Sequence, residues 1–171
     1  MTEQPATDDT TTDQATTDEV TTDEVTTDEV TTDEVTADEV TAGSEAVGLV
    51  LDPSAVLAYT QGNTGVDDLV STVLADGGVV VVPAVSLAET RSELAYAEEL
   101  ARLDALLGAV TVAPLGGADA VGLGRLASRL NGSLGLAHAV AEAHRHEARL
   151  LTAHGPAVRR TIGELDGIVD L

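Results

Sequence analysis

Two carboxylates follow short apolar runs of the chain, in positions where a folded protein could use them in chemistry. Asp52 follows the run 47–51, and Glu89 lies six residues beyond Pro83, the residue that ends the run 79–82. Such short runs of Val, Leu and Gly are typical of buried parallel strands. Ligands bind outside the carboxyl ends of parallel strands, so both acids are expected beside that crevice. Two carboxylates there could hold one Mg²⁺ that keeps several waters.

Each acid also has a simpler interpretation, which stays open at this point. Asp52 can act as the N-cap of a helix that begins with Pro53, because the missing N–H of proline is no loss in a first turn. Glu89 can be a solvated helix residue. In that case the chain is an ordinary small α/β interaction domain and Asp52 is only a cap.

The remainder of the region after residue 46 alternates between strand-like and helix-like segments. Strands separated by helices imply a parallel sheet that is covered on both faces. The expected strands are 47–51, 79–82, 110–112, 149–152 and 168–171, and the expected helices are 53–60, 66–74, 84–107, 118–130, 134–147 and 157–162. The fold class is therefore α/β, with a central, mainly parallel sheet of about four or five strands, in the domain 47–171.

Residues 1–46 differ from the rest in composition and are predicted to be a disordered acidic tail. From residue 11 to 40 a five-residue unit repeats, most often as Thr-Thr-Asp-Glu-Val. A period of five gives the valines no common face in a helix or in a strand, and the self-repulsion is strong. The simplest interpretation is that this low-complexity segment serves only to keep the protein in solution. Phosphorylation of the threonines, or imitation of a nucleic acid by the polyanion, are the alternatives.

Charge and composition restrict the function classes. Residues 1–46 carry 15 acidic and no basic residues, and residues 47–171 carry 15 acidic residues and 8 Arg, with no Lys or Cys anywhere. RNA binding is not favoured by this charge, and with two Tyr as the only aromatic residues there is no stacking platform for bases. The core must be built from Ala, Val and Leu. Neither a signal peptide nor a membrane span is recognisable, so we expect a cytoplasmic protein.

Four segments of the chain are informative in their order and spacing: Asp52-Pro53-Ser54-Ala55 after its apolar run, 79–83 leading to Leu87-Ala88-Glu89, 137–143, and Leu150-Leu151-Thr152-Ala153. Together they resemble the PIN domain family, most closely its actinobacterial VapC-like ribonuclease toxins. The resemblance covers about residues 47–171. It implies a three-layer α/β/α fold, a homodimer in many members, and hydrolysis of RNA that depends on Mg²⁺ or Mn²⁺ held by three or four acids. Asp52 and Glu89 match the first two acids, as catalytic residues and metal ligands.

The chain departs from the PIN pattern at the other two acid positions. Leu136 stands where the third acid opens a helix, and His154 stands at the fourth position. Leu136 is also unexpected from local physics, because a helix capped by Ser133 would usually carry Glu, Gln or Asp three residues on. The leading interpretation is a degenerate, toxin-antitoxin-related PIN-like domain that acts as a binding or regulatory module, with an antitoxin or another protein as partner. The alternative is an active Mg²⁺- or Mn²⁺-dependent endoribonuclease toxin in which His154 replaces one metal ligand.

The other histidines show no metal-binding spacing. His138 and His144 are six residues apart, and His144 and His146 are two apart, so neither pair shares a helix face. Cations near the end of the helix 134–147 suit its dipole. These histidines, like the arginines around them, are therefore expected to have structural or solvated roles.

Overall fold

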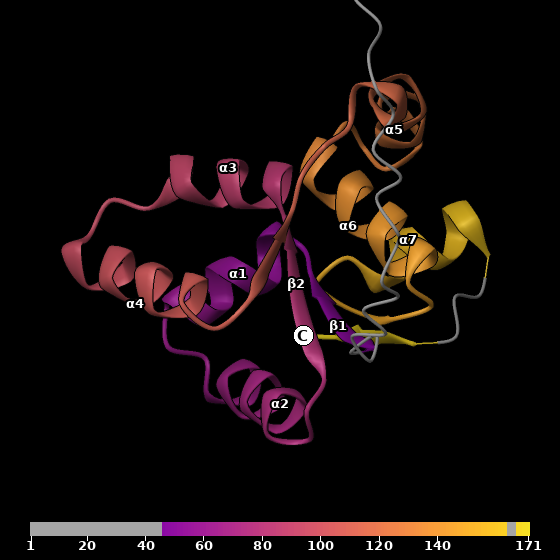
Figure 1. Ribbon diagram of the computed structural model, residues 1–171. Coiled ribbons are helices and arrows are strands. Elements are labelled where there is room, and N and C mark those ends of the chain that lie inside the picture. The colour runs from indigo at the N-terminus through magenta and orange to yellow at the C-terminus, as the bar shows by residue number, and fades with distance from the viewer. Residues whose placement is uncertain (1–45, 164–166) are drawn as a thin grey trace, which may run out of the picture. The chain divides into compact units, whose positions relative to one another are not determined.

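Five short strands form one sheet in which every pairing is parallel (Figure 1). The computed structural model describes residues 46–163 and 167–171, so the predicted tail 1–46 lies almost wholly outside the described residues. The strands are β1 (Val47–Leu51), β2 (Val79–Pro83), β3 (Thr111–Ala113), β4 (Arg149–Thr152) and β5 (Ile168–Asp170), in the order β3-β2-β1-β4-β5. The predicted α/β class with a parallel central sheet is confirmed.

Helices fill every connection between consecutive strands, as a parallel sheet requires. They are α1 (Pro53–Thr60), α2 (Thr64–Ala75), α3 (Ala84–Glu93), α4 (Ala97–Leu107), α5 (Gly117–Arg129), α6 (Leu134–Arg145) and α7 (Gly155–Ile162). None of the helices in the described part of the chain has the length and apolar character needed to cross a membrane.

The alternation of side chains along the strands divides the core into two clusters. Leu49 and Leu51 of β1 pack with α1, α2 and α4, whereas Val50 between them packs with α5, α6 and α7. Figure 1 shows these two groups of helices on opposite sides of the sheet. Both faces are therefore buried, which explains why the strands are continuous apolar runs rather than alternating ones. The layers are helices, sheet and helices.

Leu, Val and Ala supply all of the buried hydrophobic residues in the described chain. This confirms the composition-based prediction, since the chain has neither Phe nor Trp. Small side chains let helices approach the sheet and one another closely. Helix α6 is the extreme case, because eight of its twelve residues are buried and four of those eight are Ala or Gly.

The single helix predicted over 84–107 is wrong, because the chain forms two helices there. Leu94 leaves the helical conformation, with φ −75° and ψ 125°, and turns its side chain into the core. The carboxylate of Glu99 accepts hydrogen bonds from the backbone N–H groups of Ala95 and Tyr96, at 3.3 and 3.2 Å, and so starts α4. The spacing of the apolar residues continues through Leu94, so this spacing could not predict the break.

Gly135 allows α6 to come close to two other helices. A Cβ atom there would lie 2.5 Å from Cγ of Pro53 and 2.5 Å from Oε2 of Glu89, and the proline ring cannot yield easily. Gly124 in α5 has no atom within 4 Å of the corresponding position. The two helical glycines therefore differ only in their surroundings.

Opposite effects on stability are expected when these two glycines are replaced. Gly135→Ala should lower the free energy of unfolding by about 1–3 kcal/mol through overpacking. Gly124→Ala should raise it by about 0.4–1 kcal/mol, because Ala restricts the unfolded chain. Urea unfolding of the two variants and the wild type checks this, and a gain in stability for both variants would contradict the close packing at Gly135.

Candidate functional site

The candidate site lies where the strand order of the sheet changes direction. From β1 the chain places β2 and β3 on one side and then returns to place β4 and β5 on the other. The carboxyl ends of β1 and β4 are therefore neighbours at a topological switch point, the usual place for a ligand in an open α/β sheet. Asp52 follows β1 and Thr152 ends β4, so both residues stand at this point.

Both carboxylate oxygens of Asp52 accept hydrogen bonds within the protein. Oδ1 accepts from the Ser54 hydroxyl at 2.6 Å and from the backbone N–H of Ala55 at 2.8 Å. Oδ2 accepts from the Thr152 hydroxyl at 2.5 Å. The prediction that Asp52 caps the helix begun by Pro53 is confirmed. The residue is also 0% exposed, so its carboxylate is reached by protein donors and not by bulk water.

The hydrogen bonds around Asp52 continue into the chain that follows β4. The Ser54 hydroxyl accepts from the backbone N–H of Ala153 at 2.9 Å, and the Thr152 hydroxyl accepts from that of His154 at 2.9 Å. Each hydroxyl thus donates to Asp52 and accepts from the turn before α7. The Asp52 network, defined as Asp52, Ser54, Thr152 and these backbone groups, links the carboxyl ends of β1 and β4 to the turn before α7.

Burial raises the pKa of the Asp52 carboxyl above its ordinary value, because a charge is poorly solvated inside the protein. The hydrogen bonds from Ser54, Thr152 and Ala55 lower the pKa, and nearby His154 lowers it further, but these effects are smaller than that of burial. The three donors therefore only partly compensate for the loss of water.

Glu89 serves the beginning of α6 rather than open solvent. Its Oε1 accepts from the backbone N–H of Gly135 at 3.0 Å, and the Ser133 hydroxyl lies 3.4 Å from its Oε2. The Ser133 hydroxyl in turn accepts from the N–H of Leu136 at 3.0 Å, which confirms Ser133 as the N-cap. A carboxylate from α3 thus pairs with a first-turn N–H of α6, although not with the Ser133 N–H that a capping-box acid at position 136 would accept from.

Helix α3 is fixed to its neighbours by two further hydroxyls. Ser86 donates to the carbonyl of Gly135 at 2.9 Å, and Thr90 donates to the carbonyl of Pro53 at 3.1 Å. Glu89 lies between these residues in the sequence and approaches Pro53 across Gly135. The structure therefore brings Asp52 and Glu89 to adjoining helix N-termini, those of α1 and α6.

The side chains at the other two positions of the expected acid cluster do not have the surroundings of metal ligands. Leu136 is buried among apolar residues, and His154 is exposed at the start of α7. Throughout residues 46–163 and 167–171, no group of three or more His, Cys, Asp or Glu side chains is arranged to hold a metal ion. Metal binding by Asp52, Glu89 and His154 stays a prediction.

A buried polar pair on α6 was missed in the sequence. Both His138 and Glu142 have side chains that are 2% exposed, and His138 Nε2 lies 3.7 Å from Glu142 Oε1. On the other side, His146 Nε2 lies 3.5 Å from Glu142 Oε2. The signal was the spacing of four residues from His138 to Glu142 and from Glu142 to His146, which puts all three on one helix face.

Arginines at the surface pair mostly with local acids and carbonyls. Arg145 lies 3.1 Å from Asp119, and Arg159 lies 2.7 Å from Asp170. Arg129 donates to the carbonyl of Thr161 and joins α5 to α7. These contacts agree with the structural or solvated roles expected for the basic residues.

Comparison with known proteins yields a likeness to solved structures and no match to a family or a curated protein. The chain is similar to the crystal structure of PAE2754 from Pyrobaculum aerophilum, at 17% identity and a TM-score of 0.48. The similarity covers 72% of this chain and 90% of that chain. A parallel α/β sheet of this kind is compatible with a PIN-like fold.

The raised pKa of Asp52 predicts a pH-dependent difference between the wild type and Asp52→Asn. The cost of the buried charge is absent below about pH 3.9, the ordinary pKa of Asp, and is fully present above the raised pKa. As the pH rises toward 7, the wild type should therefore lose stability relative to the variant. Urea unfolding of both proteins between pH 4 and 7 measures the difference between their free energies of unfolding. The other acids titrate in both proteins, so their contributions cancel in this difference. A difference that does not change with pH would contradict the raised pKa.

His138 is expected to stay neutral to a lower pH than an ordinary histidine. Burial lowers its pKa most, Arg145 lowers it further, and Glu142 and Asp119 raise it. Its contribution to stability is then complete above about pH 6.5 and is lost as the pH falls below that value. NMR titration of the ring protons checks this, with His138→Gln identifying the resonance. A midpoint above 6.5 would show that the two acids outweigh burial.

Proposed function

We propose that the protein is a PIN-like domain, related to toxin-antitoxin ribonucleases, whose acidic site has become structural and which acts as a binding or regulatory module. Its basis is the resemblance in four segments together with the parallel α/β fold. Its partner is a protein, for which an antitoxin is the candidate that the resemblance implies, and a homodimer is the proposed assembly.

One observation carries the proposal. The two carboxylates that match the family's first two acids are both engaged by the protein itself. Asp52 is fully buried and accepts from three donors, and Glu89 accepts from the N-terminus of α6. Each carboxylate therefore has a structural role of its own, which does not depend on any catalysis.

The donor set does not fit a divalent cation well. At an effective dielectric constant of about 20, a carboxylate attracts a divalent ion 4 Å away by roughly 8 kcal/mol before desolvation is subtracted. Three hydrogen bonds to a charged acceptor, at about 1.5–3 kcal/mol each, are of the same size and would have to be rearranged at Asp52. Leu136 offers no oxygen, and the side chain of His154 belongs to an exposed residue. A weakly held ion, or none, is what this set supports.

Calorimetric titration of Mn²⁺ into the full chain tests the proposal, beside the double variant Asp52→Asn, Glu89→Gln. We expect the same isotherm for both proteins, because any binding then comes from other acids, and we expect no cleavage of single-stranded RNA with Mg²⁺ or Mn²⁺. Circular dichroism verifies that the variant is folded.

An opposite result would favour the active ribonuclease. Binding tighter than about 100 µM, which corresponds to about −5.5 kcal/mol, would have to be present in the wild type and absent in the variant. RNA cleavage lost in the same variant would complete the case. The module hypothesis would then be wrong, and His154 would be the next residue to replace.

A further inference from the structure

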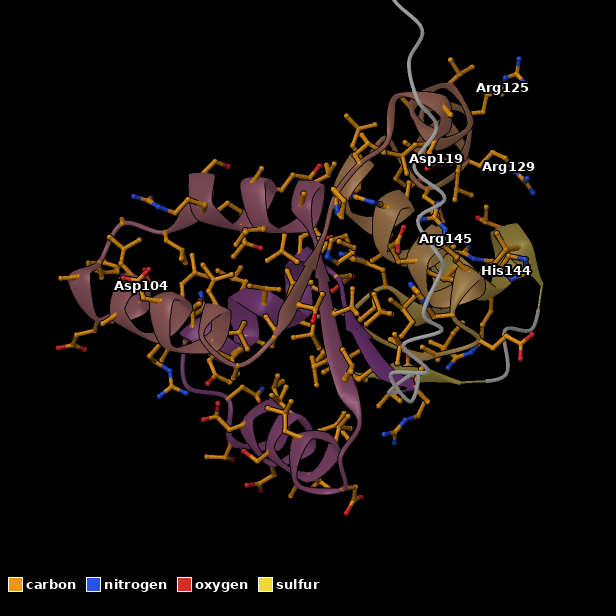
Figure 2. All side chains as sticks on the ribbon, in the orientation of Figure 1. Asp104, Asp119, Arg125, Arg129, His144 and Arg145 are labelled. Carbon is orange, nitrogen blue, oxygen red and sulfur yellow. The ribbon has the colours of Figure 1, made fainter. Side chains whose placement is uncertain are left out.

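A pocket lies between α5 and α6, apart from the Asp52 network. Its volume is about 160 Å³, well above the roughly 10–15 Å³ that one water molecule requires, so it has room for several non-hydrogen atoms. Apolar side chains form part of its wall, namely Leu115, Leu123 and Leu126. The polar part of the wall consists of Asp119, His138, Glu142 and Arg145. Figure 2 shows Asp119 and Arg145 close together on these two helices.

Two buried polar atoms of residues in this wall have no hydrogen-bond partner in the described structure, Nδ1 of His138 and Oε1 of Glu142. With the N–H of the neutral ring on Nε2, the nitrogen that faces Glu142, Nδ1 is an acceptor. Arg145 Nη1 lies 2.8 Å from the same glutamate oxygen, but as an ion-pair contact that lacks hydrogen-bond geometry. Such groups are rare inside proteins, since most buried polar atoms are paired. Because both residues belong to the pocket wall, a donor bound in the pocket could give one of these atoms a partner.

The charge of the wall indicates the kind of donor. Asp119 and Glu142 are acidic, Arg145 is the one arginine in the wall, and it pairs with both acids. With His138 neutral, the wall has a net charge of −1. An anion would meet this charge unfavourably, whereas a cation would restore neutrality.

We propose that this pocket binds a small primary ammonium ligand on a short apolar chain. An ammonium group has three N–H donors, so it can pair one of the two atoms, Nδ1 of His138 or Oε1 of Glu142, and still donate to a second acceptor in the wall. Its alkyl chain would contact the leucines of α5. A free amine or a lysine side chain of a partner has this chemistry, and the chain itself contains no lysine.

The experiment is an NMR titration of the full chain with n-butylammonium chloride at about 150 mM salt, which screens weak attraction to exposed acids. We expect a saturable shift of the His138 ring resonance. Butanol, which lacks the charge, should bind at least fivefold more weakly, and butyrate should not bind. Nα-acetyl-lysine N-methylamide separates the two sources, because only a pocket that accepts a side chain will bind it as well.

Matched variants remove one negative charge at a time. Glu142→Gln should weaken butylammonium binding at least fivefold, whereas Asp104→Asn should leave it unchanged. Asp104 is exposed on α4, and Figure 2 shows it far across the domain from Asp119. Equal weakening by the two variants would mean unspecific attraction of cations to an acidic protein, and would overturn the proposal. So would the absence of a saturable shift in the wild type.

A third variant tests the pocket without changing any charge. Gly122 belongs to the pocket wall on α5, and nothing lies within 4 Å of where its Cβ would be. Gly122→Leu should therefore fold, since Leu favours a helix more than Gly does. Its side chain should fill the pocket and abolish butylammonium binding. Unchanged binding by this folded variant would place the ligand elsewhere and refute the assignment.

Discussion

The carboxylate of Asp52 is the group on which the centre of the fold depends. It lies at the end of β1, where α1 begins and where β4 ends alongside, and each of these elements leaves a donor to be satisfied. A buried carboxylate without donors would be very costly, and unpaired N–H groups at a helix start would be costly too. Placing them together gives the N–H groups an acceptor and offsets part of the cost of the buried charge, although burial still raises the pKa of Asp52. The result is a switch point whose carboxylate is held by hydrogen bonds within the protein, at the place where α/β proteins commonly bind a ligand.

Glu89 also pairs a carboxylate with a helix N-terminus, but here the two groups are far apart in the sequence. The N-terminus of α6 has a serine cap but no local acid, and the acid comes from α3 instead. Because capping and metal ligation use the same lone pairs, an acid at a family position does not identify a catalytic group by itself. The groups that bond to the acid show whether its role is structural or catalytic. At both Asp52 and Glu89, the partners are helix N-termini, which favour a negative charge by their own dipoles.

The sequence was sufficient for the local features and insufficient for the distant ones. The strand 47–51, the cap at Asp52 and the cap at Ser133 depend on neighbours in the chain, and each is found as predicted. The break at Leu94 was missed because the apolar spacing runs through it and the cause is packing in the core. The bond from Gly135 to Glu89 spans 46 residues, so no local pattern could indicate it.

Helix α6 accounts for the two separate polar regions of the domain. Its small residues let it lie buried against the sheet, α3 and α5, so the polar side chains of His138 and Glu142 are buried as well, whereas His144 and Arg145 at its end are exposed. At its start the polar groups are paired by Glu89. Three and seven residues beyond Gly135, about 4.5 and 10 Å along the axis at 1.5 Å per residue, His138 and Glu142 remain incompletely paired. Asp52 and Glu89 have hydrogen-bond partners within the protein, whereas His138 and Glu142 each have an atom without one. Recognition of a small ligand is therefore better supported at the α5–α6 pocket than at Asp52 and Glu89.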